Sequence, residues 1–477
     1  ILFVQKNVTC IMEYNTYTDG FFDVGEKFGF LPKKEPLLKL PSQFKELQKI
    51  IESMPIFTDD GTPGLLSKEG AIEIEISKLP NYVKLIDKEK DPFILQALFR
   101  SYAFISSAFT LAPAHFAYIK TGKYGKANNN LPKQIAEPFV KVSKKIDVYP
   151  WLDYHYAYSL GNYSKKNSKK GFNWENLNMA AKFSGLPDER GFIMLHVDIN
   201  QHSPDLIKSL ISFQKNHETI KETNKALNLS LKTMININKR RQLMWTASRW
   251  KHYNDFRIFI MGIKGNEEIF GKGLVYEGVS KTPRQYRGQT GAQDNIIPMM
   301  DIFTGIINHY PKNDLTRYLQ DLRSYRPKCI QNFLEDLKNY FSKKGNTIIE
   351  VLIKQKNYSG IKILLEILEE IYLFRNGHWQ FVQKYIMKNT AYPRATGGTP
   401  IISWIPNQIK AVFLSMEYSF NKLPNDFIKV HMKSWTESFE NKKSLLDKQL
   451  EILSKKNYDA NKVLSLNKKL NLSDQPK

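Results

Sequence analysis

Residues 371–382 read IYLFRNGHWQFV and belong to a longer segment, 359–388, whose apolar residues recur with helical spacing. Apolar or aromatic side chains occupy positions i−7, i−4, i+3, i+4 and i+7 from His378, namely Ile371, Phe374, Phe381, Val382 and Tyr385. This spacing predicts an amphipathic helix that carries the histidine on its buried stripe. A neutral imidazole on such a face can ligate a haem iron, although a lone histidine there is more often a hydrogen-bonded core residue.

The same helical periodicity dominates the rest of the chain. It predicts further helices at 42–54, 92–112, 203–231, 294–308, 314–323 and 328–342. Prolines such as Pro113 predict breaks between the periodic segments. Strand-like alternation is sparse, and residues 71–76 fit either a strand or a short exposed helix. We therefore expect an all-α fold.

The length of 477 residues predicts two or more domains. A polar stretch at 162–170 and a loop at 183–190 precede an apolar run, which places a domain boundary near 185. We expect a small helical domain over 15–184 and a large helical domain over 185–455. The last stretch, 456–477, is predicted to be a flexible tail.

The net charge of +23 could indicate a nucleic-acid or anionic-membrane partner. The excess of lysine is scattered along the chain, however, and none of the standard nucleic-acid-binding motifs appears. No uninterrupted apolar run approaches the roughly 20 residues that span a bilayer. The two cysteines, Cys10 and Cys329, cannot build a disulfide framework or a zinc cluster. We expect a cytoplasmic monomer that binds neither nucleic acid nor membrane.

Several ordered blocks of the sequence resemble the indoleamine 2,3-dioxygenase family. They read FRIFIMGIKGN at 256–266, GLVYEGV at 273–279, GQTGAQ at 288–293, RNGHWQFVQKYI at 375–386 and TGGT at 396–399. Upstream, GFLP at 29–32, LPKQIAEP at 131–138 and VSKK at 142–145 also match. The likeness runs from about 21 to about 410.

The resemblance implies a haem-dependent dioxygenase with two all-α domains, a small N-terminal one over a larger haem-binding one. It implies that both atoms of O2 are inserted across the indole C2–C3 bond of L-tryptophan or a related indoleamine. The product would be N-formylkynurenine, in the first step of the kynurenine pathway. The implied cofactor is haem b, with the iron as Fe2+ in the active state, kept reduced by an external reductant.

Carried over residue by residue, the resemblance makes His378 the proximal haem ligand. Asp301 matches the acid near that histidine, and Arg375 matches an arginine that pairs with a haem propionate. Arg257 matches the arginine that holds the substrate carboxylate, a task suited to a guanidinium because it can form two parallel hydrogen bonds. Ordinary structural roles remain open for these last three: a capping or surface carboxylate, a solvated arginine and an ion-pair partner.

Further positions match the substrate side of the family's site. Phe192 matches an aromatic residue that packs on the indole ring, and it could equally be a core residue. The resemblance places five small or polar residues near the substrate backbone and the haem edge: Thr290, Gly291, Gly397, Gly398 and Thr399.

Three positions depart from the best-known members. His196 stands where those members have a small serine. It resembles the distal histidine of tryptophan 2,3-dioxygenase, and this resemblance predicts contact with O2 or with the indole N–H. The histidine could instead ligate the iron. His252 and Tyr253 replace two phenylalanines as predicted substrate contacts, which could cost about 1–3 kcal/mol of substrate binding. His155 falls where a distal tyrosine is often found.

These departures keep a second hypothesis open, an oxygen-binding (myoglobin-like) or weakly active haem protein on the same scaffold. The pair His196 and His252 would suit such a protein. Arg257 and the 396–399 loop argue against it, because an oxygen carrier needs neither.

Overall fold

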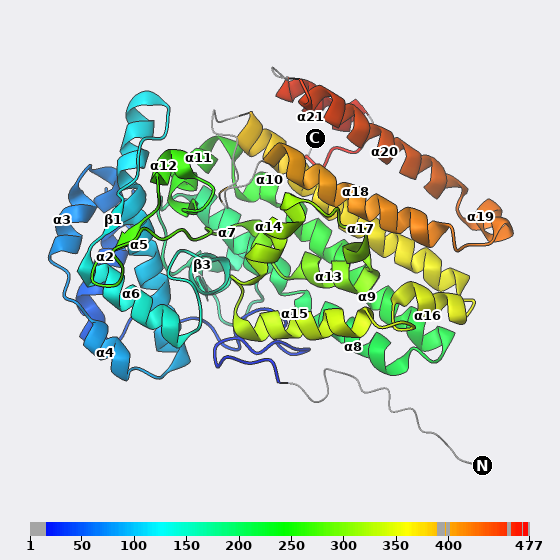
Figure 1. The fold of residues 1–477 in the computed structure, drawn as a ribbon, viewed down its shortest axis with the longest axis horizontal. Coiled ribbons are helices and arrows are strands. Elements are labelled where there is room, and N and C mark those ends of the chain that lie inside the picture. The colour runs from blue at the N-terminus through cyan, green and yellow to red at the C-terminus, as the bar shows by residue number, and fades with distance from the viewer. Residues whose placement is uncertain (1–15, 389–395, 397–400, 456–458, 470, 476–477) are drawn as a thin grey trace, which may run out of the picture.

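The computed structural model describes residues 16–388, 396, 401–455, 459–469 and 471–475. Helices dominate this part of the chain, which confirms the predicted all-α class (Figure 1). The α-helices of the first half are α2 (Lys45–Ser53), α3 (Ala71–Ser77), α4 (Val83–Lys88), α5 (Pro92–Thr121), α6 (Lys133–Lys145), α7 (Pro187–Asn200), α8 (Ser203–Asn216) and α9 (Ile220–Gln242).

The second half continues with shorter helices around the 253–304 region and long ones after it. They are α10 (Met244–Ala247), α11 (Tyr253–Arg257), α12 (Glu267–Phe270), α13 (Ile296–Thr304), α14 (Asp314–Arg323), α15 (Lys328–Phe341), α16 (Ile348–Lys354), α17 (Tyr358–Val382), α18 (Ile401–Phe420), α19 (Asn425–His431), α20 (Lys433–Leu453) and α21 (Ala460–Lys469).

Four short strands in the described part of the chain form two pairs. Antiparallel β2 (Tyr163–Lys165) and β3 (Leu177–Met179) form one pair. Parallel β1 (Asn130–Leu131) and β4 (Val275–Tyr276) form the other, which joins segments far apart in the sequence.

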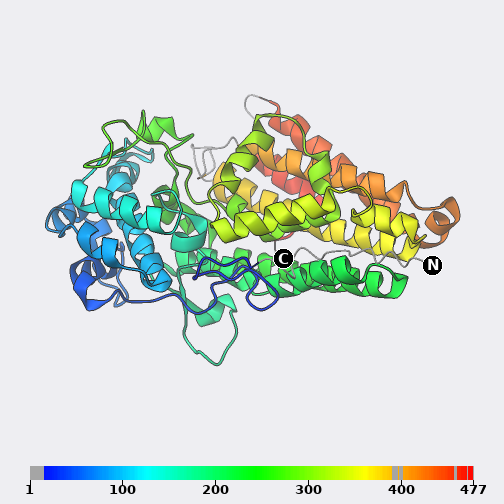
Figure 2. The same cartoon turned by 60° about the horizontal axis from the view of Figure 1, so that its bottom comes forward.

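Helices α2–α6 gather at one end of the molecule, and α8, α9 and α13–α18 form the other end (Figures 1 and 2). The segment after α11 returns to the first group: the Ser107 hydroxyl donates to the Phe259 carbonyl at 2.5 Å, and Trp151 Nε1 donates to the Met261 carbonyl at 3.2 Å. Residues of 258–276 pack on α5 and α6, so a segment that follows position 185 in the sequence belongs in space to the helices that precede it. The domain boundary at 185 stays a prediction.

Helix α5 is longer than the sequence predicted, because Pro113 lies inside it instead of ending it. A proline cannot donate to the carbonyl four residues earlier, here that of Phe109. Asn128 Nδ2 donates to that carbonyl at 2.9 Å and so satisfies it. Among the described helices, α5 is the one long and apolar enough to span a membrane; 89% of its most apolar window is buried inside the protein, as in a core helix.

Helix α17, at the centre of the long-helix end, forms where the 359–388 pattern predicted it. It begins after Asn357, whose side chain accepts from the Gly360 N–H at 2.8 Å, and it continues into a wider turn at 383–387. It packs against α9 on one side and α18 on the other. The predicted 203–231 helix is two helices, α8 and α9, since the Thr219 hydroxyl caps a new start. Residues 71–76 are helical.

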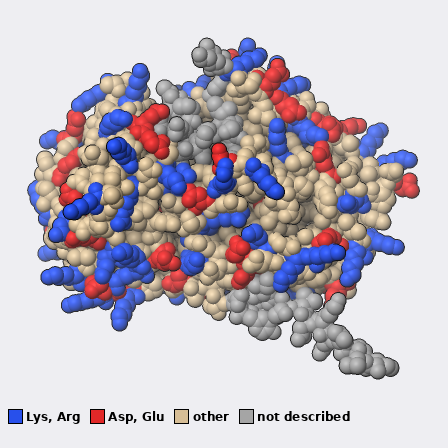
Figure 3. All heavy atoms as spheres, in the orientation of Figure 1, with Lys and Arg blue, Asp and Glu red and all other residues tan. Residues whose placement is uncertain are grey.

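The structure describes part of the C-terminal stretch 456–477, which the sequence predicted to be a flexible tail. Residues 460–469 form α21, and residues 471–475 pack back onto α9 and α17. The basic charge behaves as predicted on the face drawn in Figure 3, where lysines and arginines are scattered among acidic residues. Cys329 is a buried free thiol, and Cys10 lies outside the described residues.

Candidate functional site

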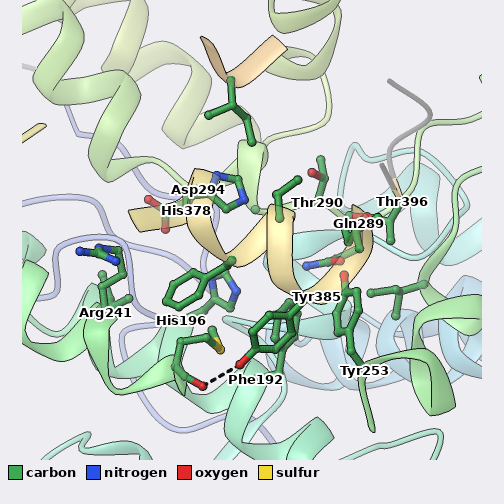
Figure 4. A pocket seen from close by; sticks show the side chains of 18 of the residues that line it. Phe192, His196, Arg241, Tyr253, Gln289, Thr290, Asp294, His378, Tyr385 and Thr396 are labelled. Carbon is green, nitrogen blue, oxygen red and sulfur yellow. Dashed lines mark hydrogen bonds between the residues drawn. The ribbon is translucent and has the colours of Figure 1, made fainter. Parts of the chain in front are cut away.

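A deep cavity opens between α7, α9 and α17, with an empty volume of about 1200 Å3 that includes its opening to solvent. Most lining side chains are apolar or aromatic (Figure 4). The polar or charged ones are His196, Arg241, Tyr253, Gln289, Thr290, Asp294, His378, Tyr385 and Thr396.

His378 projects from α17 into this cavity, as Figure 4 shows. Its side chain is accessible although it lies deep in the protein, because its exposed surface faces the cavity. Burial, with smaller contributions from His196 and Arg241, lowers the pKa of His378 to about 4. The imidazole is therefore neutral near pH 7, the form that binds a metal.

His196, from α7, lines the same cavity and belongs to a polar network behind it. The Tyr154 hydroxyl donates to Asp294 Oδ2 at 2.9 Å and lies 3.2 Å from His196 Nδ1. Asn200 Nδ2 donates to the same carboxylate oxygen at 2.8 Å. The single proton of the tyrosine goes to Asp294, so His196 Nδ1–H donates to the tyrosine oxygen. His196 Nε2 is then a bare acceptor, and burial lowers the pKa of this histidine, which keeps it neutral.

Arg241 is a cavity residue that the sequence did not single out. It is 4% exposed, its Nη1 pairs with Asp474, and its Nη2 donates to Asp474 Oδ1 at 3.2 Å. In the sequence it stands in a run of three basic residues at the end of a helix, a pattern typical of a solvated terminus. The one sequence feature that could have indicated this role of Arg241 is Gly377, because a glycine inside a helix leaves room for a neighbouring side chain.

Arg375 and Asp301 bind each other in the interior. Arg375 Nη2 lies 2.5 Å from Asp301 Oδ2, and its Nη1 donates to the Gln408 carbonyl at 3.1 Å. Neither residue is among those that line the cavity. The match to a propionate-binding arginine stays a prediction, and in this arrangement the Arg375 guanidinium is engaged by Asp301.

Arg257 is fully buried and lies behind the cavity wall. Its positive charge lies near the hydroxyls of Tyr124 and Tyr253, where it opposes the rise in their pKa values that burial causes. Tyr253 itself lines the cavity, so it stands between the arginine and the space that a substrate would occupy. The predicted contact of Arg257 with a substrate carboxylate therefore stays a prediction.

The structure brings Phe192, Thr290 and Gly291 to the cavity wall, where the sequence predicted substrate contacts. Phe192 packs edge-on against His196, with ring centroids 5.9 Å apart. Thr396 lines the cavity too, and its hydroxyl donates to the Gln289 carbonyl at 2.9 Å. The predicted contacts Gly397, Gly398 and Thr399 lie outside the described residues.

Two of the histidines considered above lie elsewhere. His252 is 38% exposed at its side chain and pairs with Asp255 at 3.0 Å, and it does not line the cavity. His252 ends a short turn at the surface, whereas its neighbour Tyr253 lines the cavity, and the predicted substrate contact of His252 stays a prediction. His155 is a core residue whose Nε2 lies 3.2 Å from Asn295 Oδ1. Within the described residues, no three His, Cys, Asp or Glu side chains form a metal-ligand cluster.

The fold and the site define a class: an all-α protein with a large apolar cavity that holds a neutral histidine on one wall and a second histidine on the other. Comparison with known proteins agrees with the motifs. The family model described as indoleamine 2,3-dioxygenase matches residues 19–401. The chain belongs to the indoleamine 2,3-dioxygenase family, a family of oxidoreductases.

Individual relatives match at modest identity. The chain is 25% identical to indoleamine 2,3-dioxygenase 1 of Rattus norvegicus, over 80% of this chain and 92% of that protein. It is 26% identical to the Mus musculus protein of the same name, over 76% and 84%. It is also 30% identical to a myoglobin of Haliotis madaka, over 32% of this chain and 40% of that protein.

Proposed function

We propose that this protein is a haem-dependent dioxygenase that cleaves the indole C2–C3 bond of L-tryptophan, or of a related indoleamine, to N-formylkynurenine. One observation carries the proposal: His378 presents a neutral imidazole to a large apolar cavity, within a chain that belongs to a dioxygenase family. Such a product is the starting compound of kynurenine formation.

The residues of the cavity fit haem b. His378 would bind the iron, and the aromatic side chains of the walls, such as Phe374 and Phe381, would cover the porphyrin faces and edges. Arg241 would meet a porphyrin carboxylate. When bound, haem in the Fe2+ state supplies the activation of O2, while the protein supplies ligation, orientation and exclusion of water. We also propose an external reductant that keeps the iron as Fe2+.

The opposite wall suits an indole. Phe192 offers an aromatic face, and His196 Nε2 is the acceptor that an indole N–H needs. The side chain of Tyr253 replaces some apolar contact with a hydroxyl that lies near the Arg257 charge. We therefore expect L-tryptophan to bind more weakly here than in a relative with phenylalanine at this position.

The alternative, an oxygen-binding haem protein, gains some support from the myoglobin likeness. That likeness covers 32% of the chain, whereas the likeness to dioxygenases covers 80%. The suggested pair of distal histidines also fails, since His252 lies outside the cavity. The observations therefore favour the dioxygenase. A cytoplasmic location, a monomeric state and the lack of nucleic-acid or membrane partners stay predictions.

Turnover tests the proposal. Purified protein is loaded with haem, reduced, and mixed with L-tryptophan and O2 while N-formylkynurenine is followed. We expect product from the wild type, its loss in His378→Ala, and a raised KM for L-tryptophan in Arg257→Ala. Reversible O2 binding without product would reject the dioxygenase in favour of the oxygen-binding alternative.

A further inference from the structure

The C-terminal residues 471–475, here called the strap, bind across two helices of the cavity wall. Gln380 Nε2, on α17, donates to the Leu472 carbonyl at 2.9 Å, and the Asp474 N–H donates to Gln380 Oε1 at 2.8 Å. Gln242 Nε2, at the end of α9, donates to Asp474 Oδ1 at 2.9 Å. The strap lies beyond the residues 19–401 that match the family model.

The centre of this contact is the ion pair of Asp474 with Arg241. The two side chains are 10% and 4% exposed, so the charges are mostly removed from water. Arg241 Nη1 and Nη2 both bind the Asp474 carboxylate, and Arg241 Nε donates to Asn238 Oδ1 at 3.0 Å. These bonds use three of the five N–H groups of a guanidinium, which leaves two for a further acceptor.

The guanidinium is also held tightly by shape. A Cβ added to Gly377 would lie 1.9 Å from Arg241 Nη1 and 2.3 Å from Cζ, so the arginine rests on the bare backbone of the residue before His378. The rings of Phe374 and Phe381 lie on α17 with their centroids 5.8 Å from Arg241 Cζ. The arginine, both rings and His378 all line the cavity.

The two N–H groups of Arg241 that Asp474 and Asn238 leave free can donate to an acceptor in the cavity beside His378. The match to the family assigned that task to Arg375, but Asp301 engages Arg375 away from the cavity. Among the described residues that line the cavity, Arg241 is the single arginine. A planar guanidinium with free N–H groups binds carboxylates well, and removing the partner of a buried charge is costly.

We propose that Arg241 binds a carboxylate of the porphyrin cofactor and that Asp474, on the strap, is a positioning residue that holds Arg241 in place for it. The inference rests on the proposed haem binding. It assigns to the C-terminal segment a part in cofactor retention: the strap fixes the guanidinium against Gly377, and the guanidinium fixes the porphyrin edge.

The test compares haem with haem dimethyl ester, which lacks the carboxylate charge. Dissociation of each from the reduced and oxidised protein is timed by transfer to an excess of apomyoglobin. For the wild type we expect the ester to leave faster than haem. For Arg241→Gln we expect haem to leave on the order of tenfold faster than from the wild type, with the ester little changed.

Asp474→Asn should give a smaller acceleration of haem release in the same direction, and Asp474→Glu should restore part of the wild-type rate. Glu451→Gln is the matched control, because it removes one carboxylate from the exposed face of nearby α20; it should release haem at the wild-type rate. Arg241→Lys keeps the charge but loses the planar fork, so it should weaken the preference for haem over the ester without abolishing it. Circular dichroism reports whether each variant folds.

Three results would overturn the inference. Equal release of haem and its ester from the wild type would mean that no carboxylate is recognised. An unchanged preference for haem in Arg241→Gln would mean that another residue recognises the carboxylate. Slower haem release from Asp474→Asn would mean that the strap competes with the cofactor. Failure of the wild type to bind haem at all would instead reject the proposed function.

Discussion

The two walls of the cavity are built in different ways. On the His378 side, one helix supplies Phe374, His378, Phe381 and Val382 at helical spacing, so a single element sets their relative positions. On the His196 side, α7, the residues around 253 and the 289–294 loop each contribute, and a polar network joins them. The first wall gains its geometry from local structure, whereas the second depends on contacts between distant segments. We therefore expect the first to decide cofactor binding and the second to decide chemistry and substrate.

The largest effect is expected from His378→Ala. Without its imidazole the protein should lose the histidine-ligated haem spectrum, and added imidazole should restore part of it, because the freed space faces the cavity. His252→Ala is the control, since His252 pairs with Asp255 outside the cavity. A His378→Ala protein with an unchanged haem spectrum would show that another residue is the ligand.

A smaller effect, confined to the second wall, is expected from His196→Leu. Haem should remain bound, while kcat/KM for L-tryptophan falls by about 100-fold if the Nε2 acceptor handles the indole proton. Tyr154→Phe removes the partner of Nδ1 and should cost about tenfold, because Asn200 still holds Asp294. Haem loss in His196→Leu would contradict the division of tasks between the walls, and steady-state kinetics with haem content measures both.

A double-mutant cycle can place Arg257 in the second wall. If the arginine acts through Tyr253, Arg257→Ala and Tyr253→Phe should raise KM by similar factors, on the order of tenfold, and their combination should add little. If Arg257 reaches the substrate directly, its single variant should cost far more than that of Tyr253. Initial rates across a range of L-tryptophan concentrations separate the two cases.

The smallest predicted effect concerns stability of the first wall. An alanine for glycine inside a helix usually stabilises by up to about 1 kcal/mol. At Gly377 the new Cβ would meet the Arg241 guanidinium, which Asp474 holds, so Gly377→Ala should instead lower the free energy of unfolding by about 1–3 kcal/mol. In an Arg241→Ala background the same change should be neutral or stabilising; urea unfolding of all four proteins measures this.

Sequence reasoning succeeded where local pattern decides structure. The period of the 359–388 segment predicted α17 and the face that carries His378, and ordered motifs identified the family. The predicted end of α5 at Pro113 was wrong, because a contact from elsewhere in the chain compensates for the proline: Asn128 donates to the Phe109 carbonyl that Pro113 leaves without a donor.

The second wall could not be read in this way. Tyr154, His196 and Asp294 are in contact although Tyr154 and Asp294 are 140 residues apart in the sequence. No local spacing of residues predicts such a contact. Arg241 stands in a run of three basic residues, which is typical of a solvated helix end. The pattern of the last residues is typical of a flexible tail. The ion pair of Arg241 with Asp474 depends on the packing of the cavity wall and on the absence of a side chain at Gly377, and composition predicts neither.

Isotope labelling tests the central claim most directly. Haem-loaded, reduced protein is mixed with L-tryptophan and 18O2, and the product is analysed by mass spectrometry. The account predicts N-formylkynurenine that carries two labelled oxygen atoms from a single O2 molecule. Product with one labelled atom or none, or O2 binding without product, would contradict it.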